Sequence, residues 1–130
     1  MAAGKYNIVI DKKTSFNKTQ GHYSGTPSKL NPTEADLEKD ITDGVLVPVN
    51  LTGCTLVAKM KKRIQDTAVV ITFTTNIVDA VNGIWSFSLT NTQTANLAVD
   101  SGVYDVLLTY PSGFVDKIME GNVRVEGTAS

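Results

Sequence analysis

Residues 102–125 alternate apolar and polar side chains in two arms separated by a turn, which constrains the fold most strongly. Successive side chains of a β-strand point to opposite faces. The first arm places four large side chains on one face: Tyr104, Val106, Leu108 and Tyr110. The return arm does the same with Met119, Val123 and Val125. Between the arms, Pro111 and Gly113 suit the second and fourth positions of a β-turn. The pattern therefore predicts a β-hairpin with one buried face.

Similar runs occur upstream and predict further strands. They are residues 6–10, 15–18, 54–62, 68–73, 77–81 and 84–89. Asn82-Gly83 predicts a type I′ hairpin turn, in which both central residues have positive φ. Trp85 alternates with Phe87 and Leu89, which favours a core position over a sugar-stacking platform. About seven short strands with frequent turn signals predict a two-sheet sandwich. Residues 90–97 are expected to connect two strands through one helical turn.

Residues 20–47 depart from this pattern and are expected to form an insertion. They are rich in Gly, Ser and Pro and contain few apolar anchors. Asn31 and Pro32 predict the start of a short helix, with Asn31 as N-cap and an end near Lys39. Because long loops in compact domains are usually functional or disordered, we expect a partner-binding surface here.

Composition bounds the class of protein. The chain has 130 residues, which fits one domain, residues 1–130, and its 12 basic and 13 acidic residues give a net charge of -1. Such a balance lacks the electrostatic footprint of a nucleic-acid binder.

Cys54 is the only cysteine, so no intrachain disulfide forms, and its place beside an apolar strand predicts a buried thiol. No apolar run approaches the roughly 18 residues that cross a bilayer, and no secretory signal is visible.

No arrangement of residues indicates catalysis. His22 is the only histidine, and we expect it on a surface loop rather than in a metal site. A Ser-His-Asp arrangement stays open in principle, although no serine stands in a nucleophile-elbow context. The acidic residues between 34 and 43 lack calcium-loop spacing, so they predict a solvated helix face, with a weak divalent site as the alternative. Residues 59–63 are basic and predict the outer face and end of a strand. We predict no enzyme activity, catalytic residue, metal or cofactor.

Six segments in order carry a resemblance to a known family. They are YNIVI (6–10), NLTGCT (50–55), NGIWSFSL (82–89), TANL (94–97), SGVYDV (101–106) and GNVRV (121–125). With this order and spacing the chain resembles the N-terminal domain of phage upper-baseplate proteins and related tail-fibre anchoring proteins. The segments are distributed along most of the chain except the insertion, residues 20–47.

The resemblance implies an immunoglobulin-like antiparallel β-sandwich that acts as a non-enzymatic adaptor in a virion. Its implied place is the tail baseplate or the tail-fibre attachment, after synthesis in the host cytoplasm. The implied partners are other virion proteins and other copies of the chain, not nucleic acid or membrane. The family domain often heads a longer fibre protein, whereas this sequence ends at Ser130, so we expect a connector, baseplate component or decoration protein.

Two further functions stay open. A capsid decoration or head-fibre protein would use the same fold elsewhere on the particle. A carbohydrate-binding module would need exposed aromatic side chains, for which Tyr23 and Phe114 are the candidates. We expect partner contacts on the first strand with its N-terminal tail, on residues 20–44 of the insertion, and on residues 126–130. The candidate contact residues are Tyr6, Ile8, His22, Tyr23, Leu30, Leu37 and Phe114.

Overall fold

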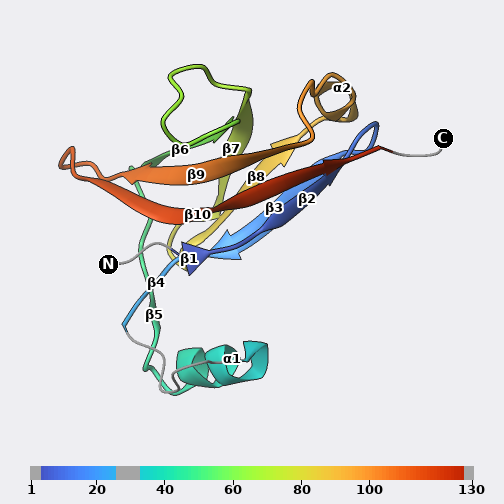
Figure 1. Cartoon of the computed structure of the whole chain (residues 1–130). Coiled ribbons are helices and arrows are strands. Elements are labelled where there is room, and N and C mark those ends of the chain that lie inside the picture. Colours follow the sequence, from blue (N-terminus) through green and yellow to red (C-terminus); the bar gives the residue numbers. More distant parts are fainter. Residues whose placement is uncertain (1–3, 26–32, 128–130) are drawn as a thin grey trace.

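The computed structural model describes residues 4–25 and 33–127, in which strands dominate (Figure 1). In chain order the elements are β1 (Gly4–Lys5), β2 (Ile8–Asp11), β3 (Phe16–Gly21), β4 (Tyr23–Ser24), α1 (Glu34–Thr42), β5 (Val47–Pro48), β6 (Thr55–Lys61), β7 (Ile71–Asp79), β8 (Ile84–Leu89), α2 (Asn91–Ala95), β9 (Ser101–Thr109) and β10 (Val115–Glu126). The all-β prediction is confirmed.

The main sheet is mixed and nearly closes into a barrel. Its strand order is β1-β10-β9-β6-β7-β8-β3, and β2 also pairs with β10. β1 and β2 run parallel to β10, whereas the other neighbours are antiparallel. The prediction of a wholly antiparallel fold is therefore wrong at the N-terminal strands. Alternation predicts which face is buried but not strand direction, and parallel partners need no tight turn between them.

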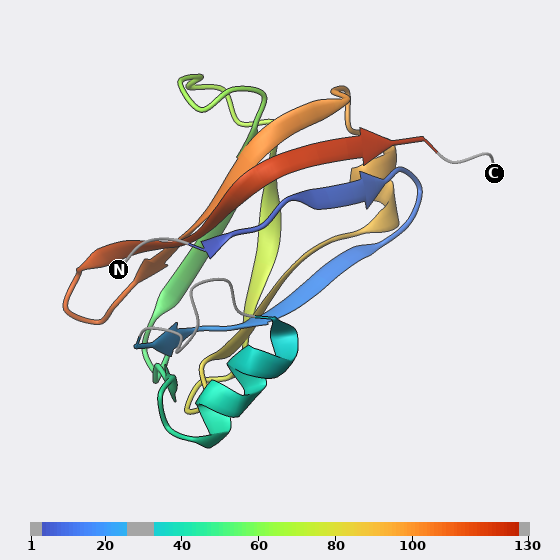
Figure 2. The same cartoon turned by 60° about the horizontal axis from the view of Figure 1, so that its bottom comes forward.

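One long strand joins the two halves of the sheet. Residues 71–73 of β7 pair with β6, and residues 74–79 pair with β8. The prediction of two separate strands at 68–73 and 77–81 is wrong, because no Gly or Pro interrupts the chain between them. The barrel stays open at its edges, where β2 and β3 diverge from the turn that joins them (Figure 2).

The core lies between the two halves of the sheet. Most alternating residues predicted to share buried faces are buried: Trp85, Phe87, Leu89, Tyr104, Val106, Leu108, Met119, Val123 and Val125. Tyr110, predicted on the same face as Tyr104, is only half-buried. The Trp85 and Tyr104 rings both stack on the Phe87 ring, with centroid distances of 5.5 and 5.8 Å. Each large side chain contributes about 1.5–3 kcal/mol by leaving water. The predicted core position of Trp85 is confirmed. Cys54 is a buried free thiol, as predicted, and burial raises its pKa.

The two predicted hairpin turns have different outcomes. At 110–113 the Gly113 N–H donates to the Tyr110 carbonyl at 2.9 Å, which confirms the turn. The type I′ prediction is wrong, because Gly83 has a φ of +69° but Asn82 does not have a positive φ. The loop has four residues, 80–83, and the Asp79 carboxylate accepts a bond from the Asn82 side-chain amide at 2.8 Å.

Both helices begin with a capping box. Thr90 caps α2 and confirms the predicted helical turn. α1 is capped by Thr33 and Asp36 and continues to Thr42, beyond the predicted end at Lys39. The cap predicted at Asn31 lies outside the described residues. α1 and the small β4–β5 sheet lie at one end of the molecule, away from the β6–β7 loop (Figures 1 and 2).

Candidate interaction surface

The solvent side of β6, β9 and β10 presents side chains in rows, because the three strands pair directly. Three rows form the centre of this outer face: Val57–Leu107–Lys117, Lys59–Asp105–Glu120 and Lys61–Val103–Asn122. The alternation of β6 that buries Leu56, Ala58 and Met60 turns the intervening residues outward. The prediction of a half-buried strand with a basic face is confirmed.

The β6–β7 loop stands beside this face and makes it concave. Ile64, Thr67 and Val69 of the loop line a cavity of about 490 Å³ over β6 and β9. A neighbouring cavity of about 340 Å³ reaches β1 and β10, and Ile64 lines both. Together they form the outer groove, lined by Lys5, Asn7, Lys59, Lys61, Ile64, Thr67, Val69, Val103, Tyr104, Asp105, Leu107, Lys117, Glu120, Gly121 and Asn122. Apolar and charged side chains thus share one hollow.

The outer groove carries an excess of positive charge. Four lysines and two carboxylates line it, which gives a net charge of +2 in a chain whose total is -1. Lys117 forms an ion pair with Glu120, with an N–O distance of 3.1 Å. Within the part of the chain that the structure describes, Lys59 and Lys61 form no ion pair. Their ammonium groups are therefore available to an external carboxylate.

The open edge at β3 is less suited to binding a further strand. Lys18, near the middle of β3, is half-buried between the exposed Asn17 and Thr19. Its ammonium lies over the Tyr6 ring, 5.6 Å from the centroid. A charge pointing inward from an edge strand opposes pairing with another chain, because the added strand would bury it. The outer groove is thus the better candidate for partner binding.

Of the candidate contact residues that the structure describes, none lines the outer groove. Tyr6 and Phe114 are exposed, with 44% and 64% of their surface accessible. Tyr23 and Leu37 are half-buried. Leu30 lies outside the described residues. The prediction of Ile8 as a partner contact is wrong. Its side chain is buried, because β2 turns it into the core against β10.

The prediction of His22 on a surface loop is also wrong, because the residue is buried with only 7% of its surface exposed. The backbone N–H of His22 donates to the Gly83 carbonyl at 2.8 Å, and its backbone carbonyl accepts from the Val49 N–H at 3.0 Å. These two bonds tie residue 22 to the β7–β8 loop and to the segment that follows β5. Burial lowers the pKa of the imidazole, and the Asp116 carboxylate acts in the opposite direction. The Gly- and Ser-rich sequence around His22 concealed this packing.

A basic cluster at residues 59–63 was the available sequence signal for the groove. It could not predict the hollow, because the lining comes from β1, β6, β9, β10 and the β6–β7 loop. Among residues 4–25 and 33–127, no group of three or more His, Cys, Asp or Glu is placed to hold a metal ion. No helix in those same ranges is long and apolar enough to cross a membrane.

Comparison of the chain with protein-family models gives no match, and comparison with curated proteins gives none either.

Proposed function

We propose that this chain is a non-enzymatic structural protein of a bacteriophage virion, an adaptor in the tail baseplate or at the tail-fibre attachment. The outer groove carries the binding part of the proposal. Exposed apolar side chains beside charged ones are typical of protein-binding surfaces. The resemblance of the six segments supports the place in the tail.

The proposed fold is an immunoglobulin-like sandwich. Two features favour it: β7 passes from the layer of β6, β9 and β10 to the layer of β8 and β3, and the N-terminal strand β2 pairs parallel with the C-terminal strand β10. Such a scaffold keeps the outer face rigid, because β9 is paired along both sides. A partner would then bind without ordering the backbone of β9, which lowers the entropic cost of association.

The exposed apolar residues of the outer face support an adaptor role. Val57 and Val115 are 40% and 51% exposed on neighbouring rows, and Ile64 of the loop is 61% exposed. A net charge of -1 adds little repulsion when copies or neighbouring proteins pack closely.

Carbohydrate binding is the second candidate, favoured by one observation. The Phe114 ring is 64% exposed at the β9–β10 turn and lies 5.9 Å from the Tyr110 ring. Apolar sugar faces pack on exposed aromatic rings of this kind. A glycan array without hits for the wild-type chain would remove this candidate.

Immunogold electron microscopy of intact particles from the source tests the virion proposal. We expect an antibody against this chain to label the distal tail, and the antibody pre-absorbed with pure protein to label nothing. Label over the head would replace the tail assignment by capsid decoration. An antibody that binds the pure protein but labels no particle would overturn the virion proposal.

A further inference from the structure

We propose that the outer groove binds the acidic face of helix α1 from a second copy of the chain, so that copies join head to tail. This names a partner for the surface described above and rests on the proposed adaptor function. The outer groove and the acidic face of α1 lie apart on the molecule, have opposite charges and carry those charges at similar spacing.

The groove supplies two neighbouring ammonium groups on one strand. Lys59 and Lys61 are two residues apart on β6 and face the same side, so their attachment points lie about 7 Å apart. Asp105, next to Lys59 across the sheet, compensates part of this charge, whereas the neighbour of Lys61 is Val103. The apolar side chains of Ile64 and Val69 border the lysines and supply surface that an incoming helix would bury.

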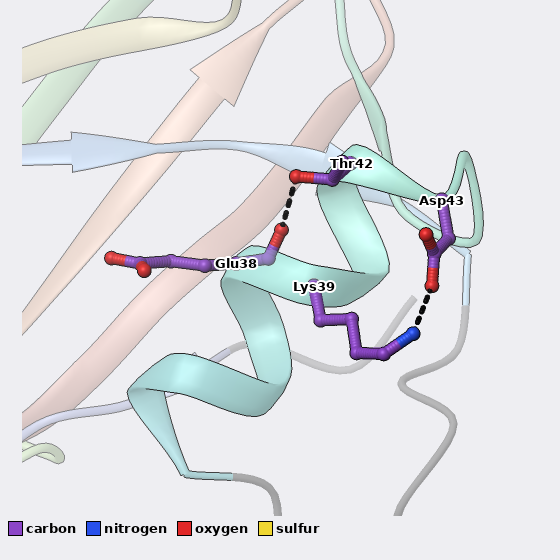
Figure 3. Close-up of polar contacts among 4 residues, drawn as sticks. All are labelled: Glu38, Lys39, Thr42 and Asp43. Carbon is purple, nitrogen blue, oxygen red and sulfur yellow. Dashed lines mark hydrogen bonds and ion pairs between the residues drawn. The ribbon is translucent and has the colours of Figure 1, made fainter.

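Helix α1 supplies two carboxylates at a matching spacing. Glu34 and Glu38 are four residues apart, so they share a face and are separated by about 6 Å along the helix axis. The Glu38 side chain extends away from the Lys39–Asp43 ion pair, whose N–O distance is 2.7 Å (Figure 3). In the described ranges neither Glu34 nor Glu38 forms an ion pair. Both are exposed and available to external cations.

The two surfaces cannot meet within one molecule. The β6–β7 loop, which borders the groove, and α1 lie at opposite ends of the molecule in both views (Figures 1 and 2). A contact between different surfaces of identical chains is heterologous, and it closes into a ring or continues as a filament. Rings and stacked copies are what an adaptor between symmetric parts of a particle requires.

Sedimentation velocity of the purified full chain tests this contact. We expect assemblies larger than a dimer as the concentration rises toward about 1 mM, a range in which weak contacts are visible. Raising NaCl from about 50 mM to about 500 mM should weaken the association, because salt screens exposed charges. Lys59→Glu/Lys61→Glu and Glu34→Lys/Glu38→Lys should each weaken it by about tenfold or more.

Mixing the two charge-reversed variants is the most specific test of the contact. In Lys59→Glu/Lys61→Glu the groove and the α1 face are both negative, and in Glu34→Lys/Glu38→Lys both are positive. Copies of one variant therefore repel each other, whereas the groove of each variant complements the α1 face of the other. We expect the equimolar mixture to recover the large assemblies. Asp11→Lys/Asp100→Lys, at exposed sites outside both surfaces and with the same change of net charge as Glu34→Lys/Glu38→Lys, should associate like the wild type. The neutral variant Glu34→Gln/Glu38→Gln, with circular dichroism of all variants, separates lost contact from lost folding.

Three outcomes would overturn the inference. They are a wild type that stays monomeric at about 1 mM, an association that the α1 variants do not change, and folded variants whose mixture does not recover. An acidic segment of another protein would be the occupant if only the groove variant affects particle assembly. The tail label in electron microscopy would survive any of these results, so failure of this contact is distinguishable from failure of the proposed function.

Discussion

Gly121 lies where residues 6 and 7 link β1 to β2 alongside β10. The Tyr6 N–H donates to the Glu120 carbonyl at 2.9 Å, and the Tyr6 carbonyl accepts from the Tyr104 hydroxyl at 2.6 Å. A Cβ at Gly121 would overlap that same Tyr6 carbonyl oxygen. Burial raises the pKa of the Tyr104 hydroxyl, so it stays protonated and keeps donating. One small residue therefore permits the parallel pairing of the chain ends.

We expect Gly121→Ala to lower the free energy of unfolding by roughly 1–3 kcal/mol, because the added methyl displaces the N-terminal segment. Urea denaturation measures this value. Gly127→Ala is the matched control, since a Cβ there meets nothing within 4 Å, and it should stay within about 0.5 kcal/mol of the wild type. Equal stabilities for the two variants would show that the close approach of the Tyr6 backbone does not constrain residue 121.

His22 predicts a pH dependence of stability. Its pKa in the folded state is lowered from 6.5 by burial, so the unfolded state binds a proton at higher pH than the folded state. The stabilisation is complete above pH 6.5 and is lost as the pH falls from there through the folded-state pKa. Titration of the His22 ring by proton NMR should give a midpoint below 6.5. In melting experiments, His22→Gln should lose less stability than the wild type between about pH 7 and pH 5. An NMR midpoint at or above the ordinary value would contradict the buried placement.

At the scale of elements, Thr94 ties α2 to the β2–β3 turn. Its side chain is fully buried, and its hydroxyl lies 2.7 Å from the Thr14 carbonyl and 3.1 Å from the Asn91 carbonyl. The sequence predicted only a helical turn for this segment. The Thr14 carbonyl that Thr94 contacts is 80 residues away, so no local pattern indicates that Thr94 is buried.

Thr94→Val keeps the shape of the side chain but leaves the Thr14 carbonyl without its donor. We expect a loss of about 1–3 kcal/mol in the free energy of unfolding, measured by denaturant titration. Thr92→Val on the exposed side of α2 is the control and should change stability by no more than about 0.5 kcal/mol. A Thr94→Val chain as stable as this control would show that the hydroxyl bonds add no net stability.

Elements with strong alternation could be predicted from the sequence, and elements that depend on distant partners could not. β6, β8, β9 and β10 appear near their predicted bounds, because alternation and turn chemistry are local properties. The parallel direction of β2 and the continuity of β7 depend on partners far along the chain. The same limit explains the errors at Ile8 and His22, whose burial is created by tertiary packing.

At the scale of the whole molecule, two surfaces at opposite ends define how it would connect its neighbours. The outer groove is basic and partly apolar, and α1 is acidic and projects from the other end. We propose that the outer groove is the surface by which the chain is held in a virion. Position 64 is the best probe of it, because Ile64 borders both cavities and is 61% exposed.

Photo-cross-linking inside assembled particles tests this proposal. A photoreactive amino acid replaces Ile64 in one variant and Ser15, exposed in the β2–β3 turn, in the matched control. We expect irradiated particles to yield adducts of the position-64 variant with a virion protein or a second copy, and few adducts from position 15. Particles that contain both variants but give adducts only from position 15 would contradict the proposal.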